Sequence, residues 1–215
     1  MRSRPCYDAI KLKIALLEYL PGRNFSELEL ATELATPRAK IREAIKLLAQ
    51  DKLITVFPQR ITTISKLDMR TTIDSIFIIK SLLAAIIKDP VPISAEMEVA
   101  IAKLEQEIAC FEKEDGIKDD EFFEIDHQFY LLICKLKPFQ RLTNIIFKEK
   151  IHIDRVIRLA LKQQDDCKTI IFYYRQVLGG IRSGNREATL HSLEKLAKTV
   201  EYYSLRTEKY YPEYF

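Results

Sequence analysis

The sequence predicts a mainly α protein: three short helices and a β-hairpin, followed by an antiparallel bundle of six helices. Two observations lead to this fold class. The 215 residues include only 5 glycines and no tryptophan but 30% charged residues, a composition typical of long amphipathic helices. Extended β-branched segments occur only within residues 52–65, and helical periodicity resumes at residue 67. With 47% hydrophobic residues, the chain can bury a core.

The pattern divides into two domains, residues 1–66 and 67–215, with the junction near residues 65–68. The charges are unevenly distributed between them. Residues 1–65 contain 11 Lys or Arg against 7 Asp or Glu, a net charge of +4, and the remainder has a net charge of −1. A basic first domain favours an anionic partner.

Two helices open the first domain. Apolar residues at helical spacing predict a helix over residues 6–19, which a Pro-Gly step ends. Ser26 and Glu29 then form an S-x-x-E capping box. In such a box the hydroxyl accepts a bond from the third backbone amide, and the glutamate reaches back to the cap. A short second helix therefore begins at Ser26 and ends near Ala35.

The third helix is amphipathic and carries a basic stripe. We expect it to begin with Thr36 as N-cap and Pro37 at the first helical position, where a missing N–H breaks no helical bond. At 100° per residue, one arc collects the apolar side chains Ile41, Ala44, Ile45 and Leu48. Arg38, Arg42 and Lys46 lie along the flank of this arc.

Two extended segments, residues 52–57 and 60–65, follow and are separated by Pro58 and Gln59, a pattern that predicts a hairpin. Three helices and a hairpin form a winged helix-turn-helix, whose third helix enters the major groove of DNA. A single helix with three basic residues is also compatible with an ordinary solvated face. The cap, the stripe and the hairpin together favour DNA, with expected contacts from Ser26, Arg38, Lys40, Arg42, Lys46 and Arg60.

The second domain is helical throughout, and short connections predict an antiparallel arrangement. The expected helices cover about residues 68–88, 94–114, 119–136, 139–163, 168–183 and 186–206. Its most apolar run is interrupted by Lys80 and is too short to span a bilayer. Four scattered cysteines and the lack of a signal-peptide pattern favour a reduced, cytoplasmic protein without membrane contact.

Residues 20–64 resemble the DNA-binding domain of the GntR family. Members have a Leu-Pro-Gly turn, a Ser-Glu helix, an S-R-x-x-V-R-E-A-L recognition helix and a P-Q-R-G wing. This chain matches that pattern at Arg38, Arg42, Glu43, Ala44, Pro58, Gln59 and Arg60. It departs from the pattern at Leu28, Pro37 and Ile61, which affects the operator sequence more than DNA binding itself. The resemblance implies double-stranded operator DNA as the partner.

The helical remainder resembles the FCD-type sensing domain of the FadR-like branch. That resemblance implies a homodimer and a small-molecule effector, usually a carboxylate, inside the bundle. Many such domains bind a divalent metal through an Asp and three His. Here the aligned positions carry Asp126, Tyr130, Tyr174 and, approximately, Leu196. The histidines present, His127, His152 and His191, fall elsewhere. We therefore expect no metal and no other cofactor.

Two interpretations of the bundle interior remain open. Asp126, Tyr130 and Tyr174 either form an internal hydrogen-bonded cluster in a filled core or line an effector pocket together with Arg155. Arg155, Arg158 and Arg175 are the candidate cations for an acidic effector, although arginines on helices are more often solvated. The tyrosine-rich C-terminal segment either packs against the bundle or a second subunit, or frays.

The sequence therefore predicts a regulator that is not an enzyme. Its DNA binding responds to an effector in the helical domain, with repression and activation both compatible. One alternative is a DNA-binding dimer without an effector, which a bundle packed solid around Asp126 would favour. The other is a metal-dependent helical enzyme, for which no nucleophile and base occur at a recognisable spacing.

Overall fold

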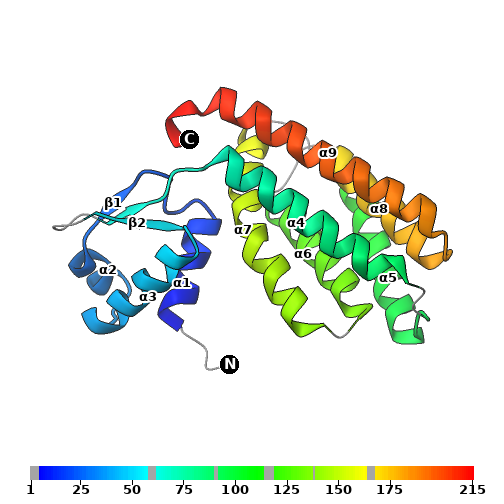
Figure 1. The fold of residues 1–215 in the computed structure, drawn as a ribbon, viewed down its shortest axis with the longest axis horizontal. Coiled ribbons are helices and arrows are strands. Elements are labelled where there is room, and N and C mark those ends of the chain that lie inside the picture. Colours follow the sequence, from blue (N-terminus) through cyan, green and yellow to red (C-terminus); the bar gives the residue numbers. More distant parts are fainter. Residues whose placement is uncertain (1–4, 58–61, 90–91, 114–118, 138, 164–167) are drawn as a thin grey trace. The chain divides into compact units, whose positions relative to one another are not determined.

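A computed structural model describes residues 5–57, 62–89, 92–113, 119–137, 139–163 and 168–215 (Figure 1). The chain forms two compact units. The first combines Met1–Met69 with Glu208–Phe215, and the second is Arg70–Thr207. The division lies three residues after the predicted junction. The last eight residues, which the prediction placed in the second domain, belong to the first unit.

The first unit is a three-helix domain with a small antiparallel sheet. Strand order in the sheet is β1-β3-β2. Its elements are α1 (Pro5–Ala15), β1 (Asn24–Phe25), α2 (Glu27–Glu33), α3 (Arg38–Gln50), β2 (Ile54–Val56) and β3 (Thr62–Ile64). The predicted winged helix-turn-helix architecture is confirmed.

Strand β1 is an element that the sequence pattern did not predict. Phe25 pairs with Thr62, and on the other side of β3 Ile54 pairs with Ile64. Phe25, Ile54 and Ile64 are buried. The pairing of β1 with β3 thus joins the segment before α2 to the hairpin and fixes both against the helical core.

The start of α3 differs from the prediction by one residue. Thr36 is not the N-cap: its hydroxyl donates to the carbonyl of Leu34 at 2.9 Å. Pro37 occupies the cap position, and its carbonyl accepts the first helical bond, from Lys40 N–H at 2.9 Å. Because proline fixes its own backbone angle, it can define this start without a side-chain cap.

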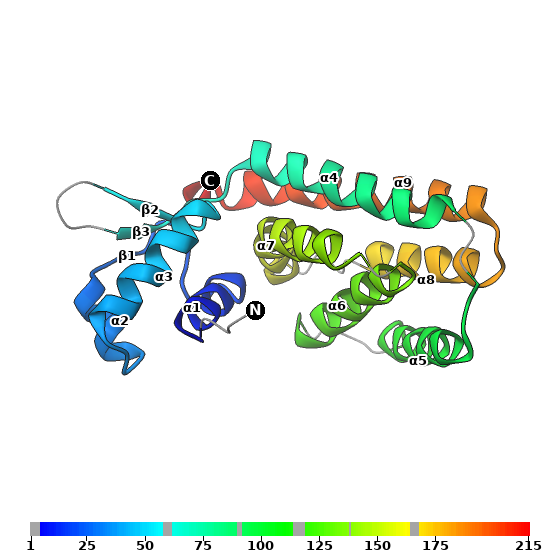
Figure 2. The same ribbon diagram turned by 60° about the horizontal axis from the view of Figure 1, so that its bottom comes forward.

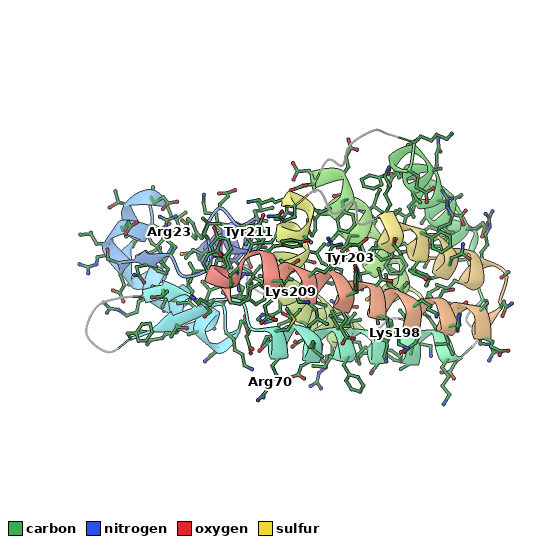
Figure 3. The ribbon with its side chains drawn as sticks, turned by 90° about the horizontal axis from the view of Figure 1, so that it is seen from above. Arg23, Arg70, Lys198, Tyr203, Lys209 and Tyr211 are labelled. Atoms are coloured by element: carbon green, nitrogen blue, oxygen red, sulfur yellow. The ribbon has the colours of Figure 1, made fainter. Side chains whose placement is uncertain are left out.

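The C-terminal segment packs against the first unit. After the last helix, Pro212–Tyr214 forms a single 3-10 turn. Leu67 N–H donates to the Tyr214 carbonyl at 2.7 Å, and Lys66 Nζ donates to the Phe215 carbonyl at 3.0 Å. Figure 3 shows Tyr211 just beyond the end of the last helix, which carries Lys198, Tyr203 and Lys209. The segment is therefore packed and not frayed, but its partner is the first unit and not, as was expected, the bundle.

The second unit is the predicted bundle of six helices. Figures 1 and 2 show its first and last helices side by side, with the others on one side of this pair. Its helices are α4 (Met69–Lys88), α5 (Ala95–Phe111), α6 (Asp119–Lys135), α7 (Gln140–Lys162), α8 (Lys168–Arg182) and α9 (Arg186–Tyr210), of which α9 extends into the C-terminal segment of the first unit.

Side chains fix the contacts among these helices. Lys80 of α4 pairs with Glu194 of α9 at 2.9 Å, and Ser75 of α4 donates to Glu149 of α7 at 2.8 Å. At the α8–α9 contact, a Cβ added to Gly180 would lie 2.3 Å from Thr189 Oγ1. Only a glycine at that position allows this approach.

Two further observations concern the whole chain. Cys6, Cys110 and Cys134 are free thiols, and Cys167 lies outside the described residues. Within the described ranges, no helix has the length and apolar character needed to cross a membrane.

Candidate functional site

Helix α3 presents a basic outer face. The side chains predicted for its core face, Ile41, Ala44, Ile45 and Leu48, are all buried. Arg38, Arg42 and Lys46 are exposed and, at 100° per residue, fall within an 80° arc. Arg38 is the first residue of the helix. These three cations are therefore exposed to an anionic surface that approaches this face of α3.

The other predicted DNA contacts have different positions. Lys40 is exposed but lies 160° around α3 from Arg42, on the opposite flank, near Cys6 of α1. Ser26 is exposed, and its hydroxyl accepts from the Glu29 amide at 3.1 Å, as the capping box predicts. The Glu29 carboxylate pairs with Arg23. Arg60 at the predicted wing tip lies outside the described residues.

The Arg42 side chain is oriented by a carboxylate of helix α2. Its Nε and Nη2 donate to the two carboxylate oxygens of Glu27 at 2.9 and 2.7 Å. These hydrogen bonds lower the pKa of Glu27, against a smaller opposing effect of burial. A two-point pair orients the plane of the guanidinium as well as its position. The sequence analysis did not identify Glu27 as part of this surface.

In the second unit, a polar cluster lies inside the bundle. The Tyr174 hydroxyl donates to Asp126 Oδ1 at 2.5 Å, across helices α8 and α6. Phe129 stacks on the Tyr174 ring with centroids 4.0 Å apart. Burial, followed by the charge of Asp126, raises the pKa of Tyr174. The predicted hydrogen bond between Asp126 and a tyrosine is therefore present.

The cation of this cluster is Lys150, which the sequence analysis did not name. Its ammonium forms ion pairs with Asp126 and with Asp154, and lies 5.1 Å from the ring centroid of Tyr130. Only 6% of the Lys150 side chain is exposed. Burial alone would lower the pKa of Lys150, but the two carboxylates raise it above its ordinary value, so the ammonium remains charged.

The predicted arginine cations occupy other positions. Arg155 follows Asp154 directly and so points about 100° away from it around α7. Arg155 is 1% exposed, and burial lowers its pKa to about 10. Arg158 lies over the Phe123 ring and 3.9 Å from Asp120, and Arg175 pairs with Glu112.

The positions aligned with the family metal site do meet in space. Asp126 contacts Tyr174, the Tyr130 and Tyr174 rings are 6.2 Å apart, and Leu196 lines the same cavity as Tyr130. The histidines are elsewhere: His127 packs on Phe147, and both His127 and His191 are exposed. In the described part of the chain, no three His, Cys, Asp or Glu side chains are placed to hold a metal ion. The donor set does not fit the metal.

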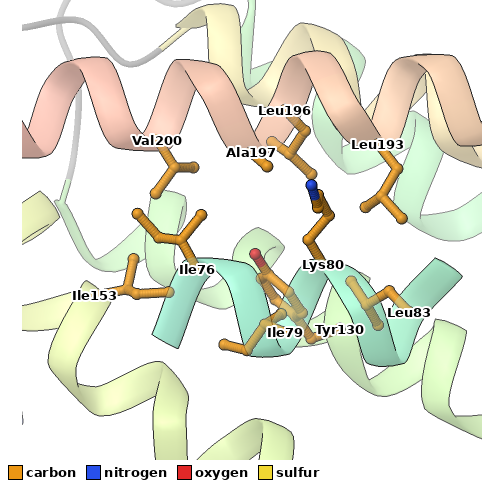
Figure 4. A pocket seen from close by; sticks show the side chains of 10 residues that line it. All are labelled: Ile76, Ile79, Lys80, Leu83, Tyr130, Ile153, Leu193, Leu196, Ala197 and Val200. Carbon is orange, nitrogen blue, oxygen red and sulfur yellow. The ribbon is translucent and has the colours of Figure 1, made fainter. Parts of the chain in front are cut away.

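A small cavity adjoins the cluster (Figure 4). It lies between α4, α9 and the Tyr130 side chain, and its walls are almost entirely apolar. Its volume of about 20 Å³ is enough for one water molecule. An effector in this place would require the helices to separate.

A larger hollow lies on the outside of the bundle between α5 and α6. It measures about 490 Å³, and its lining includes Cys110, Lys103 and the acidic residues Glu107, Glu121 and Glu124. Because its described lining is more acidic than basic, this groove is unfavourable for a carboxylate.

The first unit defines a winged helix-turn-helix protein, a class that reads DNA with its third helix. Residues 3–64 match the family described as bacterial regulatory proteins, gntR family. The match spans the helices and strands of the first unit, the part of the chain whose motifs resemble that family.

Curated relatives extend the similarity beyond this unit. A Streptomyces ambofaciens HTH-type transcriptional regulator "in unstable DNA locus" is 25% identical over 85% of this chain and 76% of its own length. The Escherichia coli K12 repressor RspR is 22% identical over 86% of this chain and 81% of its own length. These relatives are named as regulators and not as enzymes, which agrees with the predicted absence of an enzymatic activity.

Solved structures share the fold of the whole chain. E. coli McbR/YncC aligns with a TM-score of 0.72 at 16% identity, covering 96% of this chain and 99% of its own. A structure described as a GntR transcriptional regulator of Rhodococcus sp. RHA1 aligns with a TM-score of 0.70 at 16% identity. The alignment covers 93% of this chain and 95% of that structure. The described helical unit therefore shares its fold with these two structures.

Proposed function

We propose that the protein regulates transcription in the cytoplasm by binding operator DNA as a homodimer, with α3 in the major groove. The observation that carries this proposal is the exposed arc of Arg38, Arg42 and Lys46, which runs along α3 from its first residue. Guanidinium groups can bridge the acceptors of guanine, and ammonium groups pair with phosphates. Two such helices in a dimer would read half-sites about one turn of DNA apart.

A binding assay on this arc tests the first part of the proposal. We expect Arg38→Ala to weaken specific binding by about 1–3 kcal/mol, and Lys46→Ala to weaken binding to all sequences and reduce its salt dependence. An Arg38→Ala variant that binds the selected operator as tightly as the parent would remove Arg38 from recognition. Sedimentation of the protein with and without operator tests the dimer.

We further propose that the second unit is an FCD-type domain of the FadR-like branch, and that an effector acts on it near Tyr130. Supporting this are Asp126, Tyr130 and Tyr174, which are buried together inside the bundle. A ligand that binds one dimer geometry better than another would shift the population toward it and change the half-site spacing.

The size of the cavity favours the alternative of a DNA-binding dimer without an effector. About 20 Å³ cannot hold a small carboxylate, and Asp126 already has two partners. A thermal-shift screen of small carboxylates and neutral metabolites separates the two functions. A hit that changes operator affinity, and that Tyr130→Phe weakens, supports the effector; a screen without such a hit supports the alternative.

A further inference from the structure

Lys150 lies where the helices bring together the positions aligned with the family metal site. Asp126 and Tyr130 come from α6, Tyr174 from α8, and Lys150 with Asp154 from α7. The Lys150 ammonium contacts carboxylates on two different helices and one aromatic ring. It is the cation at the centre of this described cluster.

Both carboxylate oxygens of Asp126, which would have to coordinate a metal, already have partners. Asp126 Oδ1 accepts from Tyr174, and Oδ2 pairs with Lys150. Zinc, nickel or iron at this site would favour imidazole nitrogens, which the tyrosines do not supply. A divalent ion paired with both carboxylates would also compete directly with a buried, charged lysine, and like charges in a low-dielectric interior repel strongly.

A lysine is suited to this place for a second reason. Two carboxylates that share one contact point, Asp126 buried and Asp154 half-buried, repel each other when both are ionised unless a cation lies between them. Lys150 supplies that cation from inside α7, where the side chain is anchored four residues before Asp154 on the same face. The charge is therefore present whenever the helix is folded and does not depend on the supply of an ion.

We propose that the Lys150 ammonium replaces the divalent cation in this bundle, so that the helical unit carries a built-in cation and is independent of metal. The inference concerns the structural centre of the second unit and holds with or without an effector.

Substitution of the lysine gives the first test. We expect Lys150→Met, which keeps most of the length but removes the charge, to lower the melting temperature by about 10 °C, because buried Asp126 and half-buried Asp154 lose their shared cation. Lys162→Met, an exposed lysine in the same helix, is the matched control and should change it by no more than about 2 °C.

If Lys150→Met does not fold, a triple variant without charges at this cluster still tests the proposal. Combining Lys150→Met with Asp126→Asn and Asp154→Asn removes the charges that the ammonium balances. We expect the triple variant to fold and to melt above the single one. A single variant as stable as the parent, or a triple variant no more stable than the single one, would overturn the proposal.

Metal response gives the second test. The parent protein should purify without stoichiometric zinc, nickel or manganese, and its melting temperature should be the same in Mn²⁺ and in a chelator. Lys150→Ala leaves two carboxylates and an open space, so Mn²⁺ should raise its melting temperature, since oxygen ligands suit this ion. Stoichiometric metal or stabilisation by Mn²⁺ in the parent, or no response in Lys150→Ala, contradicts the proposal.

Discussion

Glu27 of α2 holds Arg42 of α3 through both carboxylate oxygens, with N–O distances of 2.9 and 2.7 Å. The Arg42 side chain remains 59% exposed to solvent, so the ion pair contributes little to the stability of the fold. Its consequence is geometric: one helix of the motif sets the direction of an arginine on the next. A guanidinium that is oriented before binding loses less conformational freedom when it meets a base.

We expect Glu27→Gln to separate affinity from specificity. Loss of the carboxylate removes a negative charge near the phosphates and frees Arg42, so binding to random DNA should strengthen while discrimination against mismatched operators falls. Competition binding of matched and mismatched duplexes measures both. Glu29→Gln, on the same helix but paired with Arg23, makes the same charge change without releasing Arg42. Equal loss of discrimination in the two variants would show that charge alone accounts for the effect.

The same pair predicts a pH dependence. Hydrogen bonds from Arg42 lower the pKa of Glu27 in the folded protein below its unfolded value. Its stabilising contribution is therefore complete above the unfolded pKa and is lost as pH falls through the folded pKa. An NMR titration of the Glu27 carboxyl should give a depressed pKa in the parent and a normal one in Arg42→Ala. An identical pKa in both proteins is the contrary result.

Two adjacent glycines of α8 should respond oppositely to alanine. At Gly180 the new methyl group would clash with Thr189 of α9, at 2.3 Å from Oγ1 and 3.2 Å from Cα, so we expect a loss of about 1–3 kcal/mol. At Gly179 a Cβ meets nothing within 4 Å, and alanine should stabilise the helix by up to about 1 kcal/mol. Denaturant unfolding of both variants gives the comparison; equal effects would mean that the helices do not approach this closely.

The C-terminal turn should protect the backbone at Leu67, in the first unit. Leu67 N–H is bonded to the Tyr214 carbonyl, so ending the chain at Tyr210 exposes this amide to water. Hydrogen exchange at Leu67 should be slow in the full chain and fast in the shortened one. The amide of Ile64, which is bonded to the Arg23 carbonyl, serves as the internal reference and should change much less. Unchanged exchange at Leu67 would show that the contact is not formed in solution.

Sequence periodicity predicted the helices well because each buries one apolar face. Helix α3 is an example: Ile41, Ala44, Ile45 and Leu48 are all buried as expected. Strand β1 was missed because two residues are too short for any period to appear. The cap at Thr36 was wrong because the following proline already fixes the start of α3.

The interior of the bundle could be predicted only in part. Alignment placed Asp126 and Tyr174 together, and they are hydrogen-bonded. It did not find Lys150, because one lysine in an amphipathic helix is ordinarily solvated. The spacing of Lys150 and Asp154, four residues apart, was a usable signal, but only the packing of α6 against α7 shows that Asp126 completes the cluster.

The roles of Arg38, Arg42 and Lys46 in DNA binding are the central claim, and selection of bound duplexes from random DNA tests it most directly. The parent protein should enrich a palindrome with half-sites about one helical turn apart. A variant with Arg38→Ala and Arg42→Ala should enrich no such sequence, whereas Lys162→Ala should select the same palindrome as the parent. Failure of the parent to enrich any sequence, or the same palindrome from the double variant, would contradict the account.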